Sequence, residues 1–201
     1  MTAITFPSSD LFSIITTHDR RRPSPSWRVL FNLPVSGDAN VDFAADTLAE
    51  RNQWAARLDD AVLRAERPVL LVASEESCFA TAWWARLSPS SYVSRVAGAL
   101  LFNPLARRES VDADDKFASP DSPLPFPTAI VGRIAKQHDL ESRLAMLADG
   151  WGSGTLSVAP HGRSRIGRQN WRKAHALLVH ATERLVERRM RVADALGIPA
   201  D

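Results

Sequence analysis

The chain has 201 residues, of which 45% are hydrophobic and 24% charged, with a formal charge of +2. These values predict one globular domain spanning residues 1–201 and exclude disorder as the default state. No apolar run approaches the roughly 18–20 residues of a membrane-spanning helix, so no membrane contact is expected. The first residues lack the basic and apolar regions of a signal peptide, and a single cysteine, Cys78, excludes an internal disulfide. We therefore expect a cytoplasmic protein.

All but three of the 25 basic residues are arginine, and many of these lie between 163 and 191. That stretch overlaps a predicted long C-terminal helix, residues 171–198, in which Glu183 and Glu187 interleave with the arginines. Mixed charges along one helix are typical of a solvated face, so nucleic acid is not expected as a partner. A protein partner or a small ligand is expected instead, with no cofactor, no metal and no predicted oligomeric state.

Predicted strands and helices alternate along the chain, and the first strand lies within a divergent N-terminal segment, residues 1–27. The predicted strands are 11–17, 29–33, 69–73, 96–102, 128–132 and 156–159; the predicted helices are 46–66, 78–87, 140–151 and 171–196. Asp46 is the expected N-cap of the first helix and Pro68 its stop, while Gly152 is the expected stop of 140–151. Residues 106–127 form a charged, proline-rich connection.

The strands are apolar on both faces, as in parallel sheets that are covered by helices on each side. The predicted fold class is therefore α/β, a mostly parallel sheet in a three-layer sandwich. Ligand chemistry in such folds occurs at the carboxyl ends of the strands. The segments that follow the predicted strands, and that could therefore hold a site, are 74–77, Asn103–Pro104, 133–139 and the loop that contains His161.

The stretch from Arg67 to Ala85 organises the rest of the chain. A wholly apolar strand, 69–73, runs into a short polar turn, 74–77, and then into an apolar helix. Strand, sharp turn and helix in this order form the nucleophile elbow of α/β-hydrolases. The turn here reads Ser-Glu-Glu-Ser and so has that shape without the usual nucleophile.

Several motifs resemble one family in register over roughly 120 residues. The matching segments are 54–59 (W-A-A-R-L-D), 70–78 (L-L-V-A-S-E-E-S-C), 82–85 (A-W-W-A), 96–101 (V-A-G-A-L-L), 124–127 (L-P-F-P), 143–153 with its closing W-G-S, His161 and Trp171. Between about Trp54 and Leu178 the chain resembles the small bacterial serine hydrolases of the YdeN type, which include retinoblastoma-binding protein nine. The resemblance implies an α/β-hydrolase-like fold and a Ser-His-Asp triad.

The same register shows where the chain departs from that family. The nucleophilic serine falls on Glu75, the histidine before it on Ser74, and the glycine after it on Ser77. The acidic triad member falls on Ala135 or Lys136. Only the base keeps its identity, at His161, and no glycine-bearing loop follows the first predicted strand.

A triad needs a nucleophile for the base to activate and a carboxylate to orient the base. With both positions changed, we expect a catalytically inactive relative that binds a protein or a small ligand. The alternative is a divergent serine hydrolase or esterase that acts on a small ester or amide with His161 as base. Its nucleophile would be Ser74, Ser77 or Cys78, with Asp139 as the orienting acid.

Three other interpretations concern the acidic pair at the turn. Glu75 itself could be a carboxylate nucleophile, although glutamate is longer than the aspartate that some elbows carry. Glu75 and Glu76 could simply favour the positive end of the helix dipole. The two glutamates could also bind a metal together with His161, but two adjacent carboxylates and one distant histidine are a weak indication of a metal site. For the neighbouring candidates, Ser77 is expected to cap the helix and Cys78 to pack in the core.

Overall fold

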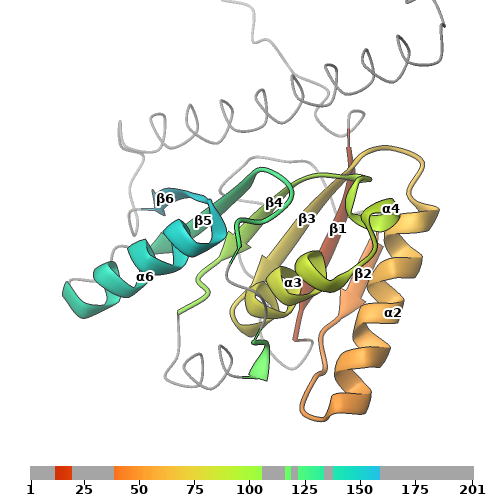
Figure 1. The fold of residues 1–201 in the computed structure, drawn as a ribbon, viewed down its shortest axis with the longest axis horizontal. Coiled ribbons are helices and arrows are strands. Elements are labelled where there is room, and N and C mark those ends of the chain that lie inside the picture. Colours follow the sequence, from red (N-terminus) through yellow and green to blue (C-terminus); the bar gives the residue numbers. More distant parts are fainter. Residues whose placement is uncertain (1–11, 20–38, 106–115, 119–121, 134–137, 159–201) are drawn as a thin grey trace, which may run out of the picture.

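The structure, a computed structural model, describes residues 12–19, 39–105, 116–118, 122–133 and 138–158. Six parallel strands form one sheet in the order β2-β1-β3-β4-β5-β6 (Figure 1). The strands are β1 (Ser13–His18), β2 (Ala39–Asp42), β3 (Val69–Ser74), β4 (Val96–Phe102), β5 (Thr128–Arg133) and β6 (Gly154–Val158). The helices are α2 (Leu48–Arg64), α3 (Glu76–Leu87), α4 (Ser90–Val93) and α6 (His138–Trp151). The parallel α/β sheet that the apolar strands predict is confirmed.

The strand order reverses at β1. The chain passes from β1 to β2 at one edge, then returns across β1 to β3 and continues to β6. Such a reversal opens a crevice between the carboxyl ends of the two strands beside it, here β1 and β3. Thr17 lies opposite Ala73, and Ser74 lies opposite Phe102, so the ends of β1, β3 and β4 meet at one level.

The two faces of the sheet carry separate hydrophobic clusters. On one face, Leu71 and Leu101 of the strands pack with Trp54 of α2, Trp84 of α3 and Ala148 of α6. The cluster on the other face consists of strand residues and Phe12, which directly precedes β1. No described helix contributes to that second cluster, so the second helix layer of the predicted sandwich stays a prediction.

Helix α2 is tied to both β1 and α3 by buried or half-buried indole groups. Its inward face carries Trp54, Leu58 and Val62, as the apolar period predicts. Trp54 Nε1 donates to Thr17 Oγ1 at 3.0 Å, and Trp84 Nε1 donates to Asp59 Oδ1 at 2.8 Å. These bonds satisfy the polar tips of two core tryptophans and fix α2 beside the β3–α3 turn.

The start of α2 differs from the prediction by one residue. The N-cap is Thr47 rather than Asp46. Thr47 Oγ1 accepts from the Glu50 amide at 3.2 Å, and Glu50 Oε2 accepts from the Thr47 amide at 2.8 Å. Thr47 makes a reciprocal capping box because Glu50 follows it by three residues, whereas Ala49 is the residue three positions after Asp46.

Several boundaries and two short elements differ from the prediction. Strand β2 and helix α4, each of four residues, were not predicted, because so short a segment shows no period. Helices α3 and α6 begin two residues earlier than the apolar pattern suggests, since helix starts are often polar. The predicted strand 29–33 and helix 171–196 lie outside the described residues. At the predicted stop of α6, Gly152 has φ 61°, and a Cβ there would lie 3.0 Å from Pro123 Cβ.

Candidate functional site

Glu75 occupies the apex of the turn between β3 and α3. Its backbone has φ 55° and ψ −126°, a conformation that a non-glycine residue rarely adopts. The Glu75 amide donates to the Phe102 carbonyl at 2.8 Å, and the Glu75 carbonyl accepts from the Cys78 amide at 3.1 Å. These bonds fix the sharp strand-to-helix turn that holds a nucleophile in hydrolases. Here the turn holds a half-buried carboxylate.

Asn103, directly after the neighbouring strand β4, also has a positive φ. Its φ is 48°, and its amide donates to the Val131 carbonyl at 2.8 Å directly after β4. Glu75 and Asn103 are the two non-glycine residues with positive φ in the described chain. Asparagine tolerates this conformation and glutamate does not. Positive-φ residues at adjacent strand ends mark this edge of the sheet as the candidate site, because backbone strain concentrates at functional sites.

Ser77 stabilises the elbow, residues 74–77, through hydrogen bonds of its side chain. Its side chain is 1% exposed. The hydroxyl oxygen accepts from the Ser74 amide at 3.0 Å and lies 2.8 Å from the carbonyl oxygens of both Thr17 and Ser74. Ser77 therefore lies inside α3 and links it to β1 and β3. The expectation that it caps the helix is wrong, because the N-cap position belongs to Glu75.

The other two candidate nucleophiles are also buried. Cys78 is 0% exposed, and its thiol lies 3.6 Å from the Phe102 carbonyl oxygen. Burial raises the pKa of the Cys78 thiol well above its usual range, so the thiolate is disfavoured. Ser74 is 8% exposed at the end of β3. The expectation that Cys78 packs in the core is confirmed.

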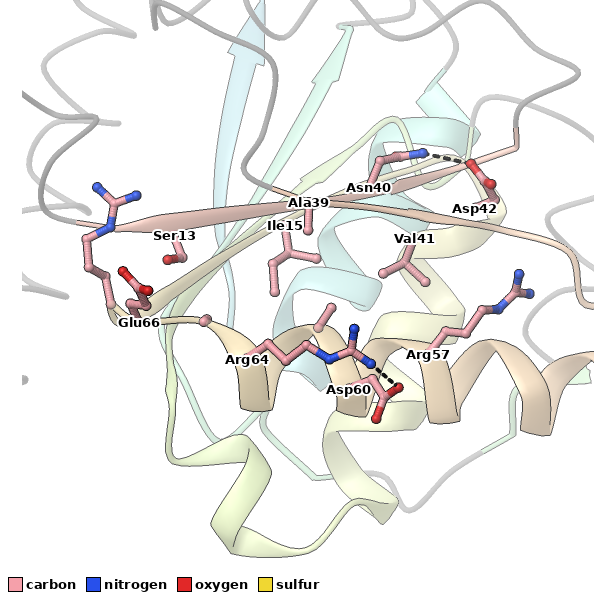
Figure 2. Close-up of a pocket in the computed structure, with 13 residues that line it drawn as sticks. Ser13, Ile15, Ala39, Asn40, Val41, Asp42, Arg57, Asp60, Arg64 and Glu66 are labelled. Atoms are coloured by element: carbon pink, nitrogen blue, oxygen red, sulfur yellow. Dashed lines mark hydrogen bonds and ion pairs between the residues drawn. The ribbon is translucent and has the colours of Figure 1, made fainter.

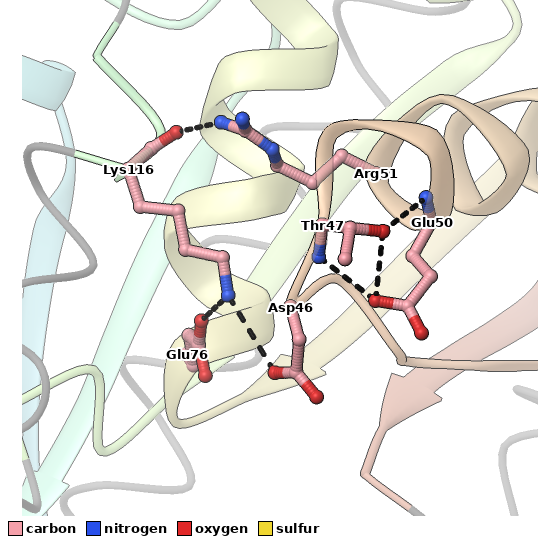
Figure 3. A network of polar contacts seen from close by, with 6 residues as sticks. All are labelled: Asp46, Thr47, Glu50, Arg51, Glu76 and Lys116. Carbon is pink, nitrogen blue, oxygen red and sulfur yellow. Dashed lines mark hydrogen bonds and ion pairs between the residues drawn. The ribbon is translucent and has the colours of Figure 1, made fainter.

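A lysine from the proline-rich connection neutralises the second glutamate of the turn. Lys116 Nζ lies 2.8 Å from Glu76 Oε1 and 3.9 Å from Asp46 Oδ1. The Lys116 carbonyl accepts a hydrogen bond from Arg51 of α2. Figure 3 shows the lysine between the starts of α2 and α3. No sequence pattern singles out Lys116, because its partners lie 40 and 70 positions away and only the fold brings them together.

His18 is a second residue that no sequence pattern singled out, because it lies one position after the predicted strand 11–17. It ends β1, one position beyond the Thr17–Ala73 pair, and is half-buried. The adjacent Thr17 carbonyl contacts Ser77, so the end of β1 adjoins the elbow. A histidine at the carboxyl end of a buried strand was the signal that could have pointed to it.

A cavity of about 580 Å³ lies between α2, the first half of β1 and the whole of β2 (Figure 2). Its charged lining is mixed in sign: Asp42, Arg57, Asp60, Arg64, Glu66 and Arg67. Arg64 and Asp60 pair at 2.7 Å, and both are well exposed. None of the residues that line the cavity belongs to the elbow, residues 74–77, so the cavity is a separate feature.

Of the remaining predicted site residues, the structure describes only Asp139. His161, Ala135 and Lys136 lie outside the described residues. Asp139 lies in the first turn of α6, after β5. Within the described residues no group of three acidic, histidine or cysteine side chains is placed to hold a metal, and no helix is long and apolar enough to cross a membrane.

Comparison with known proteins agrees with this geometry. A family model described as serine hydrolase matches residues 20–180. Among solved structures, a protein of Pectobacterium atrosepticum described as a YdeN-like hydrolase matches with a TM-score of 0.55 and 17% identity, over 87% of this chain and 91% of that one. No curated protein matches. The sheet topology, the strained elbow and the family match together show that the chain belongs to the serine hydrolase family.

Proposed function

We propose that this chain is a catalytically inactive member of the serine hydrolase family that binds a small ligand or a protein at its elbow. The observation that carries the proposal is the strained backbone of Glu75, at φ 55° and ψ −126°. Such a residue costs of order 1–3 kcal/mol and persists only where its surroundings impose it. The elbow is therefore kept, with a carboxylate in place of a hydroxyl.

The neighbouring hydroxyl and thiol groups support the absence of a nucleophile. The Ser77 hydroxyl is engaged by backbone groups of β1 and β3, and the Cys78 thiol is buried in its protonated form. A nucleophile must reach the substrate and be deprotonated by a neighbouring base. Neither group meets the first requirement in this conformation, and Ser74 is also buried.

Glu75 is the group through which the site would act. A carboxylate accepts hydrogen bonds and attracts cations, so it suits a ligand with N–H or O–H donors. Glu75 stands at the apex of the turn, the position from which hydrolases of this fold present their reactive side chain, so in this proposal its carboxylate faces the ligand.

Two measurements test the proposal. We expect no labelling of the wild-type chain by a fluorophosphonate probe and no turnover on a panel of p-nitrophenyl esters, with an active serine hydrolase as positive control. Labelling that disappears in Ser74→Ala, Ser77→Ala or Cys78→Ala would instead establish the divergent-hydrolase alternative.

The binding half of the proposal is tested by thermal shift with a panel of small amines, amides and alcohols. Because a ligand at about 100 times its Kd adds about 2.7 kcal/mol of stability, a specific ligand raises Tm clearly. We expect such a ligand to lose its effect in Glu75→Gln, which keeps the size of the side chain and removes its charge. The matched control is Glu50→Gln, which removes a carboxylate at the start of α2. A shift that survives Glu75→Gln unchanged argues against the elbow as the binding site.

A further inference from the structure

We propose that the cavity between α2, β1 and β2 binds a short apolar peptide with free ends. Figure 2 shows its lining, which comes from α2, the two residues that follow Ala65, the first half of β1 and the whole of β2. The volume of about 580 Å³ falls within the range of about 300–1,000 Å³ that is typical of small-ligand sites. The cavity is separate from the elbow and does not depend on the function proposed for it.

Small side chains on the helix side leave this space open. Ala61 of α2 and Ala65 at its C-cap line the cavity opposite the strands. Protein interiors are normally packed without voids larger than a water molecule, and larger side chains at these two positions would fill the space. On the strand side the lining includes Ile15 and Val41, whose side chains are 1% and 5% exposed. The cavity therefore has an apolar floor.

Ser13 adds a hydroxyl without a partner to this floor. Ser13 points to the same face of β1 as Thr17, four positions further on. That face is toward α2, because Thr17 Oγ1 accepts from Trp54 Nε1. Ser13 is 5% exposed and lines the cavity, and its hydroxyl makes no hydrogen bond with any residue that the structure describes. Because buried hydroxyls normally have a partner, this group indicates a ligand with amide or carbonyl groups.

Two charged side chains lie toward opposite ends of the cavity. Figure 2 shows Arg57 toward the end at Asp42, and Glu66 toward the end at Ser13. Within the described chain neither Arg57 nor Glu66 makes an ion pair or a hydrogen bond through its side chain. A ligand with an anionic group at one end and a cationic group at the other complements both.

The other charged side chains of the lining are already engaged. Arg64 pairs with Asp60 at 2.7 Å, and Asp42 Oδ1 accepts from Asn40 Nδ2 at 2.7 Å. Arg67 also has an interaction of its own. Among the described residues, the charges that the lining offers to a ligand are therefore one cation and one anion.

The spacing of these two charges sets the length of the ligand. Arg57 and Glu66 are nine positions apart along α2 and just past its end, which is roughly 13 Å at about 1.5 Å per residue. An extended peptide of four residues spans about the same length. Its carboxylate would meet Arg57 and its ammonium group Glu66. The apolar side chains would pack on Ile15 and Val41, and a peptide group would bond to Ser13.

The charged ends are tested by isothermal titration calorimetry with the tetrapeptide Ala-Val-Val-Ala in free, N-acetylated and C-amidated forms. We expect each blocked end to weaken binding about fivefold, the factor that one partly exposed ion pair contributes. Arg57→Gln should weaken the free peptide equally and leave the amidated peptide unaffected, and Glu66→Gln should do the same for the acetylated peptide. Absence of binding by all three forms, or an effect of amidation that persists in Arg57→Gln, would overturn the proposal.

A second pair of variants tests the location of the site. Ala61→Leu fills the cavity without changing its charge, so it should abolish binding while circular dichroism shows the fold retained. Glu75→Gln at the elbow is the control and should leave the Kd unchanged. The proposal is refuted if folded Ala61→Leu binds like the wild type or if Glu75→Gln abolishes binding. If Ala61→Leu does not fold, the comparison of Arg57→Gln with the amidated peptide decides, because Arg57 is exposed and its substitution leaves the core intact.

Discussion

Helices α2 and α3 begin at the same edge of the sheet and are started in opposite ways. Helix α2 begins with a complete capping box, in which Thr47 and Glu50 satisfy each other's amides. Helix α3 begins at Glu75, which has positive φ and makes no side-chain cap bond. The first start is the favourable arrangement for a helix N-terminus. The second is strained. The Phe102 carbonyl holds it by accepting from the Glu75 amide, and the Ser77 hydroxyl holds the preceding residue, Ser74.

The difference indicates that the start of α2 contributes to stability, whereas the start of α3 positions the side chain of Glu75. Nothing about helix formation requires the conformation of Glu75, whereas a ligand site requires a side chain that projects from the end of a central strand. The contrast can be tested by substitutions at each start.

The largest effect is expected for Ser77→Ala. This change leaves the buried Ser74 amide without its acceptor and deprives the carbonyls of Thr17 and Ser74 of a donor. The free energy of unfolding should fall by about 2 kcal/mol, the cost of unsatisfied buried groups. Urea unfolding followed by circular dichroism measures it, with Ser91→Ala on the exposed side of α4 as control. Equal stability of the two variants would mean that Ser77 does not hold the elbow.

The second prediction concerns the pH dependence of Cys78. Burial raises the pKa of its thiol in the folded chain, so above an unfolded-state value of about 8.5 only the unfolded chain loses this proton. Stability should therefore fall by roughly 1 kcal/mol per pH unit as the pH rises past that value. Cys78→Ala should lack this component, which is measured as the difference in slope between the two proteins from about pH 7 to pH 10. Identical slopes would mean that the folded thiol ionises in the same pH range as an exposed thiol, and would revive Cys78 as a nucleophile.

The third substitution, Glu75→Gly, should stabilise the chain. Glycine adopts φ 55° without steric cost, and the strain relieved exceeds the added entropy of the unfolded chain. We expect a gain of about 1 kcal/mol in the free energy of unfolding. Glu76→Gly is the matched control, and it should destabilise, because it places glycine inside α3 and removes the ion pair with Lys116. A loss of stability in Glu75→Gly would show that the carboxylate, and not the backbone, dominates this position.

The smallest effect is expected at the start of α2. Thr47→Ala removes the acceptor for the Glu50 amide and should cost about 0.5–1 kcal/mol, because the cap is exposed. The Thr47 amide, and then its hydroxyl, lower the pKa of Glu50, so the contribution of Glu50 is present above its unfolded pKa and is lost as the pH falls through the folded value. Glu50→Gln should therefore destabilise at neutral pH more than in acid. If the loss of stability in Glu50→Gln does not depend on pH, the capping box of Thr47 and Glu50 is not formed in solution.

Much of the fold could be predicted because local sequence already carries it. The apolar run of β4 was placed at its observed bounds, and the periodic face of α2 and the stop at Gly152 are confirmed. The sequence also predicted the turn between β3 and α3 at Ser74–Ser77, because four polar residues directly after an apolar strand are typical of a turn. These features depend on residues that are close together in the chain, so pattern and propensity suffice.

The sequence by itself thus determined the parallel α/β class, every described strand except β2, the elbow and the residue at its apex. Only the tertiary structure decided that Glu75 has a strained backbone, that Ser77 is a structural residue and that Lys116 neutralises Glu76. Each of these facts depends on partners 27 to 60 positions away, brought together by β1, β4 and the connection after β4. Burial and hydrogen bonding of a side chain are set by such distant partners, because desolvation depends on what surrounds a group in space and not on its neighbours along the chain.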